Sequence, residues 1–435
     1  MHIFFSGIGG TGIGPLALIA KQAGFEVSGS DKQDSQYIHY LMKQGIPNIH
    51  IGQTREAIEN THKQKPIDWY VFSSAIEKEN ANHPELRFVT ENNIKNSKRD
   101  VLLTHILKDK QLKLIGIAGT HGKTTTTAMT VYLMKALGLP LSYSVGAKIS
   151  FGEMGQYDPH SEYFVLECDE FDRNFLSFSP YTAIISGIGY DHHEIYPTED
   201  SYRQAFREFI GKSAWKVLWL SDYRKLSLQQ DATYLLMDEA SPEIGELKLI
   251  GDVNRHNAWA VITAVHNITK TPFKQLIGLM NAFPGVSRRM EPIYKNLYSD
   301  YAHTPEKIVG AVQIGLETAK AASQELVVVY EPLTNRRMHY TKELHKDIFN
   351  GAGKLYWVPS YLAREDPHLP VLAPAELIPY LNPDMQAKAE PAELNAELKK
   401  KIKSHLRHGA IVLCLSGGGG NSLDEWLRQQ RWGWF

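Results

Sequence analysis

Residues 115–127 read I-G-I-A-G-T-H-G-K-T-T-T-T, and this stretch decides how the middle of the chain folds. The strand-like run Leu112–Ile117 leads into a glycine-rich turn, and the apolar, helix-forming stretch Ala128–Leu137 follows it. Glycines let backbone N–H groups close around phosphate oxygens, and the N-terminus of the helix adds its positive dipole end. An ordinary strand-to-helix turn does not need glycine, lysine and hydroxyl in register, so the pattern predicts a nucleotide phosphate loop.

The side chains of this loop carry the predicted chemistry. Lys123 offers a point charge for the β- and γ-phosphates, and the Thr124 hydroxyl suits Mg²⁺. Only two residues separate Gly119 from Gly122, whereas the standard loop has four at this place. The sequence therefore predicts ATP as the nucleotide and a loop made of Gly119, Thr120, His121, Gly122, Lys123, Thr124 and Thr125.

The composition is that of a soluble globular chain of several domains. The chain has 435 residues, 43% of them hydrophobic, and a formal net charge of −1, which gives no reason to expect a nucleic-acid or membrane partner. Its two cysteines suit a reducing compartment and predict no disulfide framework. The first ten residues lack the basic segment of a signal peptide, so we expect a cytoplasmic protein.

Strands alternate with helical stretches throughout, which predicts an α/β protein with parallel sheets. The first block opens as a βαβ unit at His2–Ser6, with further strands expected at Trp69–Ser73 and Phe88–Val89. We expect three domains: a Rossmann-like N-terminal domain at 1–110, a central P-loop ATPase-like domain at 111–284, and a Rossmann-like C-terminal domain at 285–435.

The first glycine turn, G-I-G-G-T-G, spans residues 7–12, and Asp31 ends the next expected strand. Such a turn alone suits a nicotinamide dinucleotide or a nucleotide-sugar diphosphate equally well. A second nucleotide loop lies about 110 residues later, and no residues typical of hydride transfer stand out, which argues against a dehydrogenase. The predicted ligand residues here are Gly7, Gly9, Gly10, Thr11, Gly12 and Asp31.

Acidic and amide side chains follow the strands of the second block. Glu167 ends an expected strand near the phosphate loop, where a carboxylate holds a hard cation, whereas Asp169 and Glu170 fit a solvated acidic loop. His192 is a candidate for the cation or a bound phosphate. Asn254 and Asn257, three apart on one helix, can face a purine edge, although helix capping explains Asn254 nearly as well.

Arginines and one aspartate mark the third block. Arg288 and Arg289 can clamp phosphates or a carboxylate, and Asp300 can accept ribose hydroxyls. The pair Arg336 and Arg337 follows a strand end, where α/β sheets bind ligands, and predicts a site for an amino-acid carboxylate. A solvated arginine pair is the alternative.

Together these motifs resemble the Mur ligase family over nearly the whole chain. They occur in a consistent order: S-G-I-G-G-T-G-I-G, G-S-D at 29–31, F-S-S-A-I at 72–76, A-G-T-H-G-K-T-T-T-T, L-E-C-D-E-F-D-R-N-F-L, D-H, G-D-V-N-R-H-N-A, P-G-V-S-R-R-M-E and S-D-Y-A-H-T-P. Phe206 stands where the glutamate- and diaminopimelate-adding branches carry a lysine, which is similar to the alanine-adding branch.

The resemblance implies an ATP- and Mg²⁺-dependent ligase of peptidoglycan synthesis, a monomer or homodimer, that joins L-alanine to UDP-N-acetylmuramate through an acyl phosphate. It implies that Thr124, Glu167 and His192 hold cations and that Arg289 faces the phosphates. It assigns adenine to Asn254 and Asn257, and it adds His303 to the nucleotide site beside Asp300. It implies that Asp31, Ser73 and Ser74 lie near the uridine end of the bound sugar nucleotide.

Three departures from the family pattern keep other functions open. Val253 replaces the histidine before the first asparagine, Gly187 replaces an asparagine ahead of D-H, and residues 331–337 read E-P-L-T-N-R-R. The last segment is similar to that of the ligase that recycles a murein tripeptide. A polyamide ligase of the folate or cyanophycin type and a non-catalytic nucleotide sensor on the same scaffold are the remaining alternatives.

Overall fold

The computed structural model describes residues 1–435 except 74–75, 77–81, 191–194, 363–364, 366–367 and 434–435. The chain divides into two compact units, one made of residues 1–247 and 256–283 and the other of residues 248–255 and 284–435. Each unit is described by itself. In the described part of the chain, no helix combines the length and apolar character that a bilayer span requires.

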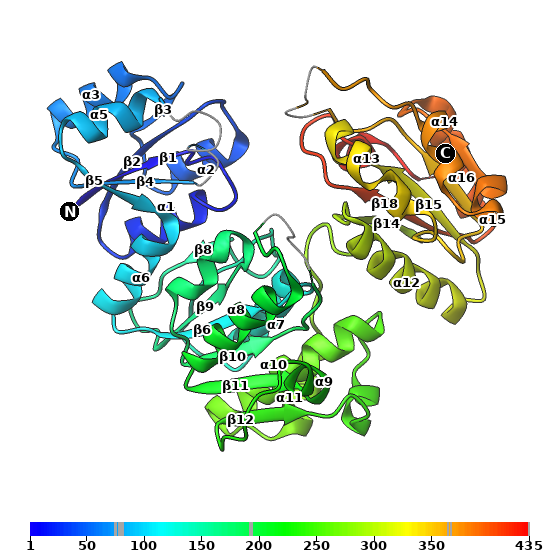
Figure 1. The fold of residues 1–435 in the computed structure, drawn as a ribbon, viewed down its shortest axis with the longest axis horizontal. Coiled ribbons are helices and arrows are strands. Elements are labelled where there is room, and N and C mark those ends of the chain that lie inside the picture. The colour runs from blue at the N-terminus through cyan, green and yellow to red at the C-terminus, as the bar shows by residue number, and fades with distance from the viewer. Residues whose placement is uncertain (74–75, 77–81, 191–194, 363–364, 366–367, 434–435) are drawn as a thin grey trace. The chain divides into compact units, whose positions relative to one another are not determined.

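The first unit begins with a five-stranded parallel sheet (Figure 1). In spatial order its strands are β3 (Ile49–Ile51), β2 (Glu26–Asp31), β1 (His2–Ser6), β4 (Trp69–Phe72) and β5 (Lys95–Lys98). The helices of this part are α1 (Gly14–Gln22), α2 (Gln36–Lys43), α3 (Arg55–Gln64), α5 (Pro84–Glu91) and α6 (Arg99–Asp109). Because β1 and β2 are parallel neighbours, their carboxyl ends lie side by side at the same end of the sheet, and the first glycine turn follows β1 there.

The same unit contains a seven-stranded sheet that is parallel except for the pairing of β7 with β8. In spatial order its strands are β12 (Tyr234–Met237), β11 (Trp215–Trp219), β10 (Thr182–Ile185), β6 (Lys113–Ala118), β9 (Tyr163–Glu167), β7 (Ser142–Ser144) and β8 (Gly155–Gln156). The helices that follow in sequence are α7 (Lys123–Ala136), α8 (Glu199–Gly211), α9 (Leu220–Lys225), α10 (Asp252–Thr269) and α11 (Phe273–Met280). The first four residues of α10 belong to the second unit.

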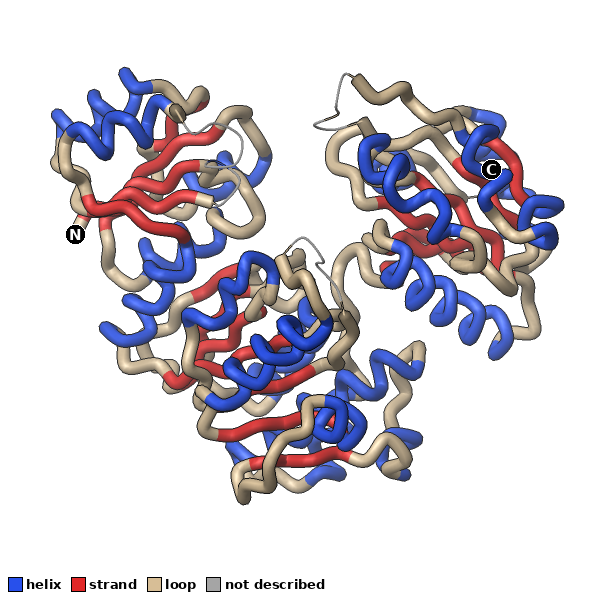
Figure 2. Tube along the Cα trace, in the orientation of Figure 1, coloured by secondary structure: helices blue, strands red, loops and turns tan. Residues whose placement is uncertain are grey.

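The second unit holds a six-stranded sheet, parallel except for the pairing of β13 with β14 (Figure 2). In spatial order its strands are β13 (Glu291–Tyr294), β14 (Leu297–Asp300), β18 (Ile411–Ser416), β15 (Leu326–Glu331), β16 (Lys354–Trp357) and β17 (Ala389–Pro391). Its helices include α12 (Pro305–Ala321), α13 (Asn335–Thr341), α14 (Pro374–Leu377), α15 (Pro383–Lys388), α16 (Ala396–Arg407) and α17 (Leu423–Gln429).

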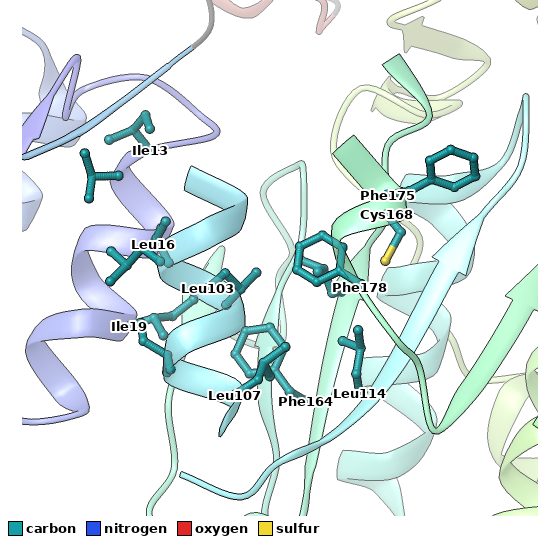
Figure 3. Close-up of a cluster of buried hydrophobic side chains, with 14 of the residues drawn as sticks. Ile13, Leu16, Ile19, Leu103, Leu107, Leu114, Phe164, Cys168, Phe175 and Phe178 are labelled. Carbon is teal, nitrogen blue, oxygen red and sulfur yellow. The ribbon is translucent and has the colours of Figure 1, made fainter. Parts of the chain in front are cut away.

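One apolar core continues from the first sheet to the central sheet of the first unit. Figure 3 shows Leu107 of α6 beside Phe164 of β9, and Leu16 of α1 near Leu103 of α6; all four side chains are buried. The apolar side chains of α6 therefore pack between the two sheets of the first unit, so separating these sheets would expose those side chains to water.

The predicted α/β class with parallel sheets is confirmed, and each predicted domain range contains one complete sheet, while the exact boundaries stay predictions. The strand expected at Phe88–Val89 is wrong, because both residues lie in α5. Pro84 sits in the first turn of that helix, a position that proline favours, and the two apolar side chains are buried on the helix. Two adjacent apolar residues are too short a signal to separate a strand from a helix.

Candidate active site

The phosphate loop forms where the sequence predicts it, between the end of β6 at Ala118 and the start of α7 at Lys123. Gly119 has a φ of +145° and Gly122 a φ of +78°, which favour glycine. A Cβ on Gly122 would lie 2.8 Å from the Asn257 side-chain nitrogen, and a Cβ on Gly119 would meet the Ser186 hydroxyl. Both glycines are therefore required by conformation and by close approach.

Thr120 links this loop to residues 187–189. Its hydroxyl lies 2.6 Å from the Gly189 carbonyl oxygen and accepts the Gly189 N–H at 2.8 Å, and the Tyr202 hydroxyl lies 2.7 Å away. The Ser186 hydroxyl donates to the His121 carbonyl oxygen. Sequence reasoning missed Ser186, which directly follows β10, and Tyr202 of α8, because neither residue belongs to a recognisable motif.

Lys123 is the first residue of α7, and its ammonium is held by two acceptors. It donates to the Gly119 carbonyl oxygen at 2.7 Å and lies 2.7 Å from a carboxylate oxygen of Glu170. Burial alone would lower the pKa of Lys123, but the charges of Glu170, Asp169 and Glu167 outweigh burial and raise the pKa. The lysine is therefore a fixed cation in the loop.

The prediction that Glu170 belongs to a solvated acidic loop is wrong, because its side chain is fully buried. The short turn after β9 bends at once into the 3₁₀ helix Phe171–Ser177, and this bend carries Glu170 back towards α7. The neighbouring Asp169 is half-buried and accepts the Phe171 N–H.

Thr124 and Glu167 meet at the predicted cation site. The Thr124 hydroxyl donates to a carboxylate oxygen of Glu167 at 3.0 Å. A Cβ on Gly146 would lie 2.7 Å from the other oxygen of Glu167, so a side chain there would crowd this carboxylate. Among the described residues, no group of three His, Cys, Asp or Glu side chains forms a metal cage. One hydroxyl and one carboxylate fit Mg²⁺, which takes few protein ligands and completes its shell with water and phosphate oxygens. His192 lies outside the described residues.

The two asparagines of α10 differ in their surroundings. Asn257 is buried, and its amide touches the phosphate loop at Gly122. The Asn254 amide donates to the Ile250 carbonyl oxygen at 2.8 Å, so part of its bonding capacity is used near the start of its own helix. Their adenine role stays a prediction, as do the nucleotide contacts of Thr125, a half-buried residue in the first turn of α7.

The first glycine turn and Asp31 come together as the sequence predicts. The Gly9 N–H donates to a carboxylate oxygen of Asp31 at 2.8 Å, and the Gly7 and Ile8 N–H groups both bond to the Ser30 carbonyl oxygen. A Cβ on Gly12 would collide with the Arg99 guanidinium. Thr11 is exposed and Ser73 is half-buried, whereas Ser74 lies outside the described residues. Sugar-nucleotide binding by this turn, including Gly10, stays a prediction.

The second unit gathers the remaining candidates near the carboxyl ends of β14 and β15. Asp300 is buried, burial raises its pKa, and its carboxylate oxygens accept the N–H groups of Met290 and Ala302 at 2.8 and 2.9 Å. Burial, with the nearby charges of Lys307, Arg337 and Arg289, lowers the pKa of His303 to about 3, so the imidazole is neutral near pH 7. The Arg289 guanidinium lies 5.5 Å from the centre of the Tyr301 ring.

The arginine pair of α13 divides into two different environments. Arg336 is exposed, whereas Arg337 is half-buried, and its Nη1 atom is buried with no hydrogen-bond partner in the described structure. Because a buried guanidinium N–H needs an acceptor, Arg337 is the better candidate for an anionic group of a ligand.

Comparison with known proteins identifies the family. Residues 2–111 match the model of the Mur ligase family catalytic domain, and residues 117–234 match that of the Mur ligase middle domain. The UDP-N-acetylmuramate–L-alanine ligase of Carboxydothermus hydrogenoformans is 28% identical, over 97% of this chain and 95% of its own. That of Campylobacter curvus is also 28% identical, over 98% and 99%.

Two solved structures share the fold. The UDP-N-acetylmuramate–alanine ligase of Thermotoga maritima matches with a TM-score of 0.75 at 22% identity, over 99% of this chain and 98% of its own. A murein peptide ligase of Psychrobacter arcticus matches with a TM-score of 0.64 at 20% identity, over 99% of both chains. The two family models together span more than half of the sequence, so the chain belongs to the Mur ligase family.

Proposed function

We propose that this protein is an ATP-dependent ligase that forms an amide bond between the carboxylate of UDP-N-acetylmuramate and L-alanine, in peptidoglycan synthesis. The observation that carries the proposal is the phosphate loop, in which Lys123 and Thr124 begin a helix opposite Glu167. The relatives named as L-alanine ligases, matched over nearly their whole length, support the choice of substrates. A cytoplasmic location is part of the same proposal.

In this reaction the muramyl carboxylate accepts the γ-phosphoryl group of ATP, and the amine of L-alanine then displaces phosphate. The protein catalyses such a reaction mainly by positioning the reactants and neutralising the negative charge of the phosphates, without forming a covalent intermediate itself. Lys123 offsets negative charge on the transferred group, and the backbone N–H groups at the start of α7 face the phosphates. The first glycine turn and Asp31 bind the sugar nucleotide, and Asn257 borders the nucleotide from α10.

Thr124 and Glu167 are the described residues that would hold Mg²⁺, and His192 would add a ligand. When bound, the cation neutralises phosphate charge and makes the γ-phosphoryl group more electrophilic. In the second unit, Arg337 would bind the carboxylate of the amino acid and Arg289 would face phosphate oxygens. Asp300 and His303 are the residues of this unit that we propose for nucleotide binding.

One sequence observation favours a second acceptor. Residues 331–337 read E-P-L-T-N-R-R, which is similar to the segment of the ligase that joins the tripeptide L-Ala-γ-D-Glu-diaminopimelate to the same sugar nucleotide. The segment covers the end of β15 and the first turn of α13, where Arg337 lies. The acceptor amine is therefore the part of the proposal to test first.

The test is phosphate release from ATP with UDP-N-acetylmuramate and one amine at a time. We expect release to require the sugar nucleotide and an amine together, with kcat/KM at least about tenfold higher for L-alanine than for the tripeptide, which corresponds to about 1.4 kcal/mol. Glycine and D-alanine are controls for the side chain and for chirality. A higher kcat/KM for the tripeptide would replace L-alanine by the recycling acceptor, and nucleotide binding without turnover for any amine would indicate a sensor.

A further inference from the structure

Glu170 is a buried carboxylate that touches the phosphate-loop lysine. Its side chain has 0% exposed surface, and the Lys123 ammonium lies 2.7 Å from one of its oxygens and 3.0 Å from the other. The backbone at Glu170 is also held, because its carbonyl oxygen accepts the Tyr196 hydroxyl at 2.7 Å and the Arg173 N–H at 3.0 Å. The carboxylate is therefore presented to Lys123 from a fixed turn.

The hydrogen-bonding capacity of Lys123 shows what this contact can do. A lysine ammonium has three N–H donors and no acceptor. One of them bonds to the Gly119 carbonyl oxygen and another to Glu170, and both acceptors belong to fixed parts of the fold. One donor remains for a phosphate oxygen, and the two protein contacts limit the directions in which it can point.

The energetic cost of breaking this ion pair bears on what happens when a nucleotide binds. Separating a buried carboxylate from a bound cation is costly, which favours keeping the Lys123–Glu170 contact when a phosphate binds. We propose that Glu170 is a positioning residue, which keeps the Lys123 ammonium against the phosphate loop while that ammonium bridges to a nucleotide phosphate. This inference rests on the proposed use of ATP at the loop.

Glu170→Gln in the full-length protein separates positioning from affinity. The substitution keeps the size and an acceptor oxygen but removes the charge that fixes the lysine. Because it also removes a negative charge near bound phosphates, we expect the Kd for ADP with Mg²⁺, measured by calorimetry, to stay within about threefold of the wild-type value. We expect kcat to fall on the order of tenfold or more, because a misdirected catalytic charge reduces the rate more than it reduces binding.

Glu162→Gln is the matched control. Glu162 directly precedes β9, the strand that Glu170 follows, and it pairs with Lys113 at an exposed site. We expect its kcat to stay within about twofold of the wild-type value. If Glu170→Gln does not fold, Glu170→Asp retains the charge but withdraws it by one methylene group, and the same loss of kcat with retained ADP binding is expected.

A folded Glu170 variant with kcat within about twofold of wild type would overturn the inference, and so would a Kd for ADP weakened in proportion to kcat, because that would indicate collapse of the site. Failure of the proposed function gives a different result: the wild-type protein itself would then not bind ADP or would not turn over.

Discussion

Lys123→Ala is expected to lower kcat by about 100-fold or more, because it removes a preorganised charge from the site where the transition-state charge develops. The structure adds a second effect. The substitution leaves the buried Glu170 carboxylate without the cation that lies 2.7 Å away, which should reduce the free energy of unfolding by about 3 kcal/mol. The measurements are steady-state turnover and the midpoint of thermal unfolding.

The double variant Lys123→Ala with Glu170→Gln separates these two effects. Removing both charges should restore much of the thermal stability while turnover stays at the level of Lys123→Ala. Lys113→Ala is the matched control, since Lys113 begins the strand that leads into the loop and pairs with Glu162 at an exposed site. Turnover of folded Lys123→Ala close to that of wild type would remove this loop from the reaction.

Arg337→Ala is expected to raise the KM for the amine acceptor by about 10- to 100-fold, which corresponds to the roughly 1.5–3 kcal/mol of a charge-assisted hydrogen bond. The buried Nη1 atom of Arg337 has no hydrogen-bond partner in the described structure, whereas Arg336 is exposed on the same helix. Arg336→Ala is therefore the matched control, and its KM should change by less than about threefold.

The KM values for ATP and for the sugar nucleotide are measured in the same series. If Arg337→Ala raises the KM for ATP alone, the guanidinium binds phosphate instead of the acceptor carboxylate. Equal effects of the two arginine variants on the amine would contradict the distinction that the structure draws between them.

The phosphate loop could be predicted from the sequence because its determinants are local. Glycine at two positions, lysine at the first helical position and a following hydroxyl all lie within six residues, and β6 and α7 flank them. The parallel sheets were also predictable, since runs such as Leu326–Glu331 are buried throughout and fit a sheet covered on both faces.

Glu170 could not be predicted, because its burial depends on distant parts of the chain. In sequence it is one of three acids after an apolar strand, but the Tyr196 hydroxyl and the start of α7 enclose it in the fold. The difference between Arg336 and Arg337 has a similar origin. Adjacent residues on a helix point in different directions, and only the packing of that helix determines which of them is buried.

The measurement that tests the central claim most directly follows oxygen from substrate to phosphate. UDP-N-acetylmuramate labelled with oxygen-18 in its carboxylate is turned over with ATP and L-alanine, and the released phosphate is examined by mass spectrometry. If the carboxylate accepts the γ-phosphoryl group, each phosphate released should carry one labelled oxygen. Phosphate that contains no label, with its new oxygen taken from water, would contradict ligation through an acyl phosphate.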